Sequence, residues 1–304
     1  MRIGVSLTSA HTNRDVREAG RWMIARAAAA REAGLESLFV GDHHAMPVPY
    51  YQNTPLLGRL LAEWGERPAG CLFLLPLWPP VLVAEQVGTL AALHPGRFIV
   101  QCALGAGRDQ FAAMGVNSRR RPSMFEESLD IVRRLLAGER VDGGERYPEI
   151  RGVAVAPLPP EPVDFWIGGS VEASIDRAAR LGDGWLAGPE LTFGLARHWI
   201  EYYRSRCHEY GRTPSAIAIR RDVLVAASET AAAGIVDPIL AAGYRGFSAD
   251  ALVWGSPATV VARFREYAAM GYTDIIIRHL TDDQDAVLTS YGHLAEVRVS
   301  VADA

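Results

Sequence analysis

Polar groups suited to chemistry follow several short apolar runs of this 304-residue chain. Asp42, His43 and His44 follow the apolar run 37–40 and place a carboxylate beside two imidazoles. An imidazole titrates near neutral pH, so a histidine at this position is suited to general acid or base catalysis. Neighbouring residues of a strand point to opposite faces, so only one of the two histidines can readily face a substrate. The sequence leaves open which one it is.

Small residues form a second candidate site between a predicted strand and a predicted helix. Gly168 and Gly169 let the backbone approach an anion closely, and Ser170 offers a hydroxyl or a helix cap. The free N–H groups at the start of the following helix point at the same place. A plain strand-to-helix turn has the same composition, so both interpretations stay open. Gly105 and Gly107 form a lone Gly-x-Gly, which a tight turn explains equally well.

Several catalytic classes lack their defining residues in this chain. All 31 basic residues are arginine, which excludes a Schiff-base or pyridoxal mechanism and a lysine-containing P-loop. No metal is expected, because two adjacent histidines suit one metal poorly and no third ligand has metal-site spacing. No Gly-x-Ser-x-Gly motif is present either. Any bound phosphate must therefore rest on arginine, hydroxyls or backbone N–H groups.

The composition is typical of a soluble globular protein. Hydrophobic residues make up 49%, the net charge is −4, and the three cysteines are odd in number. We therefore expect a cytoplasmic protein without disulfides. No apolar run approaches the roughly 20 residues that a membrane span needs, so no membrane association is expected. The one basic run, 119–121, is interpreted as a solvated loop, so we expect a small-molecule substrate and no nucleic acid partner.

Eight strand-like runs alternate with amphipathic helical runs. Strands are expected over 2–7, 37–40, 70–75, 98–104, 164–167, 184–187, 217–226 and 273–278. Because buried parallel strands read as continuous apolar runs, this pattern predicts an α/β fold, a (β/α)8 TIM barrel in one domain spanning 1–304. Insertions are expected at 138–163, before strand 5, and at 228–256, before the helix that precedes strand 8. A doubly wound sheet is the rival, but its glycine fingerprint does not follow the first strand.

Five segments between Gly34 and Arg278 resemble the bacterial luciferase-like superfamily of flavin- and F420-dependent oxidoreductases. In order, they are GLESLFVGDHHAMP, LLPLWPPVLVAEQVGTLAALHPGRF, LGAGRDQFAAMGV, FWIGGSVEASIDRAARLGDGW and GSPATVVARFREYAAMGYTDIIIR. The second and fourth are the most specific. The resemblance implies a (β/α)8 barrel whose mouth holds the ring of FMN or of the deazaflavin F420.

The resemblance also implies roles for individual residues. His43 is implied as the catalytic histidine, with Asp42 orienting it or the cofactor. The cofactor phosphate is implied at Gly168, Gly169 and Ser170. A bulge that supports the ring, often with a non-prolyl cis peptide, is implied at Cys71-Leu72.

Two departures from the family pattern concern the cofactor and the substrate. Gly105 and Arg108 stand where many FMN-dependent members carry an Arg-Gly-Tyr-type loop, so Arg108 is a candidate phosphate ligand. Trp78 stands where the family often has Arg-His-Pro, and we expect it to line an apolar substrate pocket. His44 and Tyr50 are expected to line the same pocket.

The main functional hypothesis is a luciferase-like monooxygenase that acts on a small organic substrate with reduced FMN and O2. The alternative is F420-dependent hydride transfer, which the Gly-Ala-Gly turn and the Asp-His pair favour, whereas the lack of a dense basic cleft favours FMN. A non-catalytic flavin-binding paralogue or partner subunit is a second alternative, although it should have lost His43 or the Gly-Gly-Ser turn. A homodimer is expected and, for FMN, a separate flavin reductase.

Overall fold

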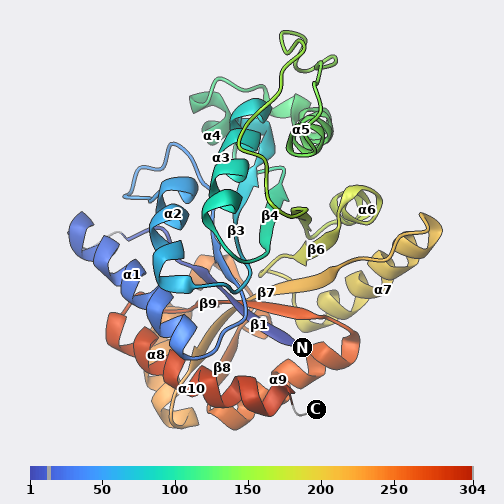
Figure 1. Cartoon of the computed structure of the whole chain (residues 1–304). Coiled ribbons are helices and arrows are strands. Elements are labelled where there is room, and N and C mark those ends of the chain that lie inside the picture. The colour runs from blue at the N-terminus through green and yellow to red at the C-terminus, as the bar shows by residue number, and fades with distance from the viewer. Residues whose placement is uncertain (12–14, 303–304) are drawn as a thin grey trace.

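A computed structural model of the chain describes residues 1–11 and 15–302 (Figure 1). Its core is one parallel sheet. The strands are β1 (Arg2–Leu7), β2 (Leu38–Val40), β3 (Ala69–Leu74), β4 (Phe98–Ala103), β5 (Asp164–Gly169), β6 (Gly184–Ala187), β7 (Ala216–Val225), β8 (Val253–Gly255) and β9 (Asp274–His279).

The sheet closes into a barrel. Strands β1 to β6 pair in chain order, β6 pairs with β7, β7 with β9, and β9 with β1. Eight strands therefore form the ring, which confirms the predicted (β/α)8 barrel. Strand β8 lies outside this ring, where Val253–Gly255 pair with Val223–Val225 at the end of β7.

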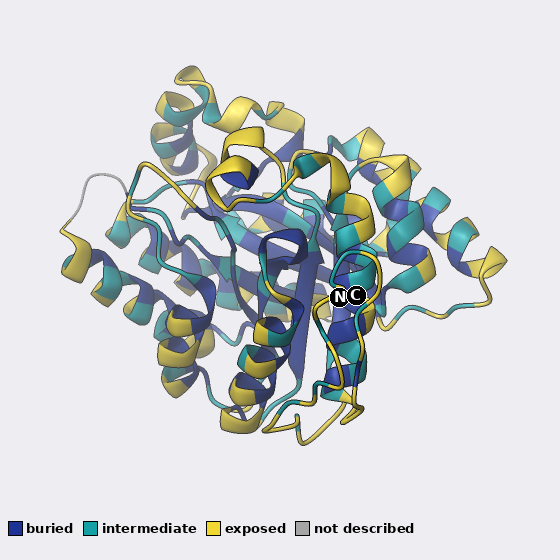
Figure 2. Ribbon diagram, turned by 90° about the horizontal axis from the view of Figure 1, so that it is seen from above, coloured by how far each residue is buried: buried dark blue, intermediate teal, exposed yellow. Residues whose placement is uncertain are grey.

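Helices surround the barrel and bury their inner faces against it (Figure 2). They are α1 (Val16–Glu32), α2 (Asn53–Trp64), α3 (Pro80–Leu93), α4 (Arg108–Ala113), α5 (Arg121–Leu136), α6 (Glu172–Leu181), α7 (Phe193–Glu209), α8 (Glu229–Ala241), α9 (Pro257–Met270) and α10 (Gln284–Ala302). Side-chain caps fix several of their starts: Asp15 accepts from Arg17 N and Glu18 N, and Ser256 accepts from Thr259 N. No helix in the described part of the chain is both long and apolar enough to cross a membrane.

The side chains of each strand alternate between two apolar layers. The barrel interior contains Phe39, Ile99, Trp166, Ala218 and Ile276. The larger layer fills the space between the barrel and the helices. The strands approach closely at Gly70, where an added Cβ would overlap the carbonyl oxygen of Ile99 on β4, so only glycine fits.

The prediction of a bulge in the third strand is wrong. Residues Ala69–Leu74 of β3 pair one to one with Phe98–Ala103 of β4, which leaves no extra residue at Cys71-Leu72. The one cis peptide bond among the described residues is Ala156-Pro157, so the bond between Cys71 and Leu72 is trans.

The two insertions differ in content. The 138–163 insertion contains one isolated bridge between Val141 and Val153 and projects from the molecule after α5 (Figure 1). The 228–256 insertion contains α8, two short 3-10 turns and β8. It therefore adds a strand that its sequence does not announce, because β8 has only three residues.

Candidate active site

The carboxyl ends of the strands converge at the barrel mouth, where TIM-barrel enzymes place their chemistry. At the end of β2, Asp42 is almost fully buried. Its Oδ2 accepts hydrogen bonds from Leu74 N and from Trp78 Nε1, both at 2.8 Å. The carboxylate of Asp42 thus fastens the end of β3 and the Trp78 indole to the end of β2.

The two adjacent histidines have different surroundings. His44 is buried, its Nε2 lies 3.2 Å from Asp42 Oδ1, and its ring packs edge-on against Trp78. Its backbone N–H donates to Oε1 of Gln110 on α4 at 2.8 Å. The Asp42–His44 approach lacks hydrogen-bond geometry, so His44 is held by Trp78 and Gln110, and Asp42 makes no hydrogen bond to His43 either.

His43 is half-buried and lies beside Tyr50, with their ring centroids 5.9 Å apart. Burial lowers the pKa of His43, and the carboxylate of Asp42 opposes this shift only partly. The imidazole is therefore neutral at pH 7 and able to accept a proton. Burial also raises the pKa of Tyr50 to about 12, so its hydroxyl stays protonated.

A small polar chamber of about 60 Å³ lies inside the mouth. Its polar lining consists of Ser6, Ser9, Tyr50, Gln101, Arg220 and Arg278. Leu72 of β3 also lines it, whereas Cys71 points the other way into the layer beneath the helices, where burial raises the pKa of its thiol. Of the two residues at the expected bulge, only Leu72 thus reaches the mouth.

Most of the polar chamber residues were not among the predicted site residues. Arg220 and Asp222 of β7 stand two positions apart, so they share the inner face of the barrel. Their guanidinium and carboxylate lie 3.0 Å apart. The charged triplet 220–222 within an otherwise apolar strand was the available signal, and so was the glutamine in the apolar run 98–103.

The turn after β5 has features of an anion cradle. Val171 N–H is taken by Ser174 Oγ at 3.2 Å, while the N–H groups of Glu172 and Ala173 in the first turn of α6 have no intrahelical partner. The hydroxyl of Ser170 lies against Gly188, where an added Cβ would overlap it. These groups and the Gly168-Gly169 backbone suit a phosphate monoester.

Two further charged groups lie at the loop beside this cradle. The carboxylate of Glu190 also lies against Gly188 and opposes a bound anion. Arg221 is completely buried behind the loop and donates to the carbonyls of Gly188 and Pro189 at 3.3 and 3.4 Å. Its guanidinium thereby fixes the loop that lies against Ser170.

Arg108 lies in a different hollow. It opens α4 after the turn of Gly105 and Gly107, whose φ angles of 75° and 85° favour glycine. Its side chain lines a surface hollow of about 400 Å³ together with Arg119 and Arg121. In the described ranges, none of these guanidinium groups has a carboxylate within ion-pair distance, and no bond joins Arg108 to the cradle.

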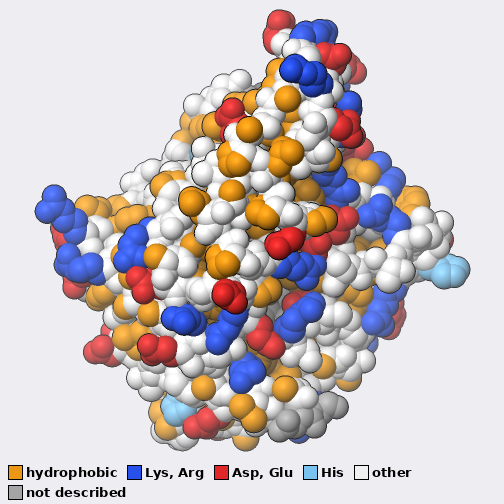
Figure 3. Space-filling model, viewed as in Figure 1, with side chains coloured by type: hydrophobic (Ala, Val, Ile, Leu, Met, Phe, Trp, Pro, Cys, Tyr) orange, Lys and Arg blue, Asp and Glu red, His pale blue; other side chains and the backbone are white. Residues whose placement is uncertain are grey.

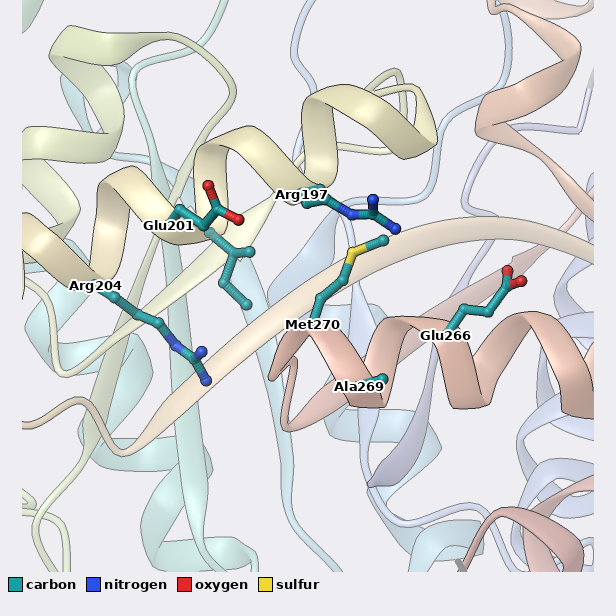
Figure 4. Close-up of a pocket in the computed structure, with 7 residues that line it drawn as sticks. Arg197, Glu201, Arg204, Glu266, Ala269 and Met270 are labelled. Atoms are coloured by element: carbon teal, nitrogen blue, oxygen red, sulfur yellow. The ribbon is translucent and has the colours of Figure 1, made fainter.

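Other hollows lie away from the strand ends. Trp78 borders an apolar groove of about 490 Å³ that also contains Met114, Met124 and Tyr147. The hollow in Figure 4 lies on the outside, between α7 and α9, and contains no strand-end residue. Over residues 1–11 and 15–302, no three His, Cys, Asp or Glu side chains gather as metal ligands would.

The family model of luciferase-like monooxygenases matches residues 1–246. The chain belongs to the luciferase-like monooxygenase family. This confirms the resemblance found in the sequence, and it makes the chain a member of an enzyme family.

Two curated relatives match different shares of the chain. An uncharacterized protein of Mycobacterium tuberculosis is 34% identical over 114 residues, which are 38% of this chain and 39% of the relative. The chain thus matches well under half the length of that relative. An F420-dependent glucose-6-phosphate dehydrogenase of Beutenbergia cavernae is 26% identical over 318 residues, with 90% of this chain and 91% of the relative covered.

Solved structures show the same fold at low sequence identity. An F420-dependent secondary alcohol dehydrogenase in complex with an F420-acetone adduct has a TM-score of 0.81 at 16% identity, and 99% of this chain and 98% of that chain are covered. The FMN-bound oxygenating constituent of 3,6-diketocamphane monooxygenase from Pseudomonas putida has the same TM-score at 18% identity, with 100% and 98% covered. The prediction of FMN or F420 as cofactor agrees with these names.

Proposed function

We propose that this luciferase-like protein is an F420-dependent oxidoreductase that transfers hydride between the deazaflavin and a small organic substrate. The observation that carries the proposal is the hollow of Arg108, Arg119 and Arg121 beside the β4 turn. It supplies the basic surface that an anionic cofactor tail needs and that the sequence alone does not reveal. The relative that matches 90% of the chain is named as F420-dependent, which supports the same choice.

The chain offers groups for each part of such a cofactor. The phosphate would rest on Gly169, Ser170 and the free N–H groups of Glu172 and Ala173. Leu72 would present an apolar side chain to the ring at the mouth. When bound, the deazaflavin supplies the two-electron redox chemistry, and the protein supplies orientation and electrostatics.

His43 is proposed to manage the proton. As hydride leaves the carbinol carbon of an alcohol, a ring nitrogen of neutral His43 accepts the hydroxyl proton; in reduction, the same nitrogen returns it to the carbonyl oxygen. The lowered pKa keeps the imidazole unprotonated and ready to act as a base at neutral pH. Asp42 acts as a positioning residue, since Oδ2 of its carboxylate accepts hydrogen bonds from Leu74 and Trp78.

Monooxygenation with reduced FMN and O2 is the second candidate. The cradle at Gly168–Ser170 suits the terminal phosphate of FMN equally well, and this observation keeps the candidate open. It would require a separate flavin reductase as partner, whereas the F420 proposal needs none. A homodimer and a cytoplasmic location stay predictions under both.

Fluorescence titration with F420 and with FMN tests the proposal directly. We expect F420 to bind at least tenfold more tightly than FMN. Tighter binding of FMN would favour monooxygenation, the second candidate. If neither cofactor binds, both candidate functions are contradicted. If F420 binds, steady-state assays with alcohols and ketones follow.

The proton role is tested with His43→Ala, and His198→Ala on the exposed side of α7 serves as control. We expect His43→Ala to lower turnover by about 10²- to 10⁴-fold, with the dissociation constant of the cofactor changed less than twofold. Equal turnover in the two variants would remove His43 from the mechanism.

A further inference from the structure

The chamber inside the barrel mouth is built from both sides of the ring. Gln101 projects from β4, and Arg278 projects from β9, which stands opposite β4 in the eight-strand order. Arg220 of β7 lies next to Arg278. Apolar side chains of Leu186 and Ile276 close the remaining wall. Polar donors therefore face one another across a small enclosed space.

The charges around this chamber do not balance. Asp222 is completely buried and lies 3.0 Å from Arg220 and 2.8 Å from Arg245, and it accepts from the Tyr244 hydroxyl at 2.8 Å. Arg278 donates its Nε to the neutral hydroxyl of Thr8 at 3.1 Å. The group thus has three guanidinium groups, of Arg220, Arg245 and Arg278. Within the described part of the chain, Asp222 is the one carboxylate that contacts them, and it contacts the first two.

Two donors at the chamber lack acceptors. Gln101 is only 4% exposed, and its Nε2 has no hydrogen-bond partner among the described residues. The same holds for Nε of Arg220. Burial and the neighbouring Arg220 and Arg245 lower the pKa of Arg278 to about 10, and the carboxylate of Asp222 opposes this shift only in part. Unmade hydrogen bonds of buried donors are costly, so these groups are prepared for an acceptor.

The outer surface gives no comparable signal. On the face shown in Figure 3, basic and acidic side chains are interspersed. The side chain of Arg220, in contrast, is only 19% exposed, and Arg278 is also partly buried. A positive charge in an enclosed site attracts an anion far more strongly than one in water.

We propose that the chamber binds an oxyanion group of the substrate, a carboxylate or a phosphate monoester, between Arg220, Arg278 and Gln101. This inference rests on the proposed function and adds the substrate class. A space of about 60 Å³ holds on the order of four water molecules, which is enough for one oxyanion group and too little for a three-ring cofactor. Guanidinium groups suit carboxylate and phosphate oxygens by their paired donors.

The position of the chamber divides the mouth between two ligands. The cradle for the cofactor phosphate follows β5, while the guanidinium groups of the chamber come from β7 and β9. An acidic substrate would therefore be anchored by its anion on the β7–β9 side, and its reacting carbon would extend toward His43 and the ring. Neutral analogues of the same size should lose this anchor and be rejected.

Thermal unfolding of the cofactor-free protein tests the proposal. Sodium acetate or sodium phosphate is titrated against chloride at constant ionic strength, with wild type, Gln101→Leu, Arg278→Gln and the control Arg134→Gln. Arg134 lies on the exposed side of α5 and pairs with Glu139, so its loss changes the net charge equally. We expect one of the two anions to raise the melting temperature of wild type and control, and this anion identifies the group.

Both chamber variants, Gln101→Leu and Arg278→Gln, should bind that anion at least tenfold more weakly than wild type. Gln101→Leu keeps the net charge and removes an amide nitrogen that has no hydrogen-bond partner, so it should fold normally. It therefore still tests the proposal if Arg278→Gln fails to fold. Equal anion effects in all four proteins, or no effect of either anion on wild type up to about 100 mM, would overturn the proposal. Parallel titration with F420 and FMN keeps the two questions apart, because cofactor binding can fail while the anion effect stands, and the reverse.

Discussion

The two sides of the barrel mouth hold their buried carboxylates in opposite ways. Asp42, after β2, accepts mainly from neutral donors, the Leu74 amide and the Trp78 indole. Asp222, on β7, lies between the guanidinium groups of Arg220 and Arg245. Removal of Asp42 would leave unpaired dipoles, whereas removal of Asp222 would leave uncompensated cations. Asp42 therefore fixes the shape of the mouth, and Asp222 fixes its charge.

The largest expected effect comes from removing these carboxylates one at a time. We expect Asp222→Ala to lower the free energy of unfolding by about 3 kcal/mol, since it leaves buried positive charge without its partner. Asp42→Ala should cost about 2 kcal/mol, because two donors lose their acceptor. Urea unfolding at pH 7 measures both.

Added anion then separates the two variants. Acetate should restore part of the stability of Asp222→Ala, because a free carboxylate can replace the lost one beside the guanidinium groups. It should not restore Asp42→Ala, whose donors are neutral. Equal rescue of both variants would contradict the distinction between shape and charge.

A second prediction concerns pH and the histidine at the end of β9. His279 is buried beside Tyr291, and burial lowers its pKa to about 3. Below pH 6.5, the unfolded chain therefore binds a proton at His279 that the native state does not bind. The free energy of unfolding consequently falls as the pH drops from 6.5 toward 3. The free energy of unfolding falls by about 1.4 kcal/mol per pH unit, which amounts to about 2 kcal/mol at pH 5.

Urea unfolding at pH 7, 6 and 5 tests this slope. The His279→Gln variant should lose this pH dependence of the free energy of unfolding, while His198→Gln on the surface should keep it. Parallel pH dependence of His279→Gln and wild type would show that His279 does not carry it. On the β2 side, the half-buried His43 should contribute much less.

The smallest expected effect distinguishes two serines of the cradle. Ser170 has its hydroxyl beside Gly188, whereas Ser174 bonds the backbone of Val171. Ser170→Ala should weaken cofactor binding about fivefold, or about 1 kcal/mol, with little change in stability. Ser174→Ala should instead cost about 1 kcal/mol of stability as a lost helix cap. Fluorescence titration and thermal unfolding, run on both variants, reveal any exchange of these roles.

The eight barrel strands could be predicted from the sequence because each is a short apolar run before a helical one. The inserted elements were harder: α8 contains Gly234 and Pro238, and β8 has only three residues. Helix α4, with six residues, was also missed. Local pattern is weak at such lengths, and only pairing with the end of β7 makes β8 a strand.

The candidate site divides in the same way. Residues at strand ends, such as His43 after β2 and Gly169 at the end of β5, stand out because their types break an apolar pattern. The bond from Trp78 to Asp42 joins residues 36 apart, and no local pattern predicts it. Arg220 and Gln101 lie within strands, where their types signal function only once the inner face is known. The bulge came from the resemblance, and the regular register with β4 removes it.

The ion pair between Arg245 and Asp222 has a consequence for how the molecule can be observed. It ties the 244–246 turn, which belongs to an insertion outside the ring, to a carboxylate inside the barrel. Amide protons of this turn should exchange with solvent at a rate that depends on how firmly Asp222 holds it. A ligand that draws Arg220 away from Asp222 strengthens the hold on Arg245 and slows that exchange. Deuterium uptake at one surface turn thus becomes a reporter of whether the chamber is occupied.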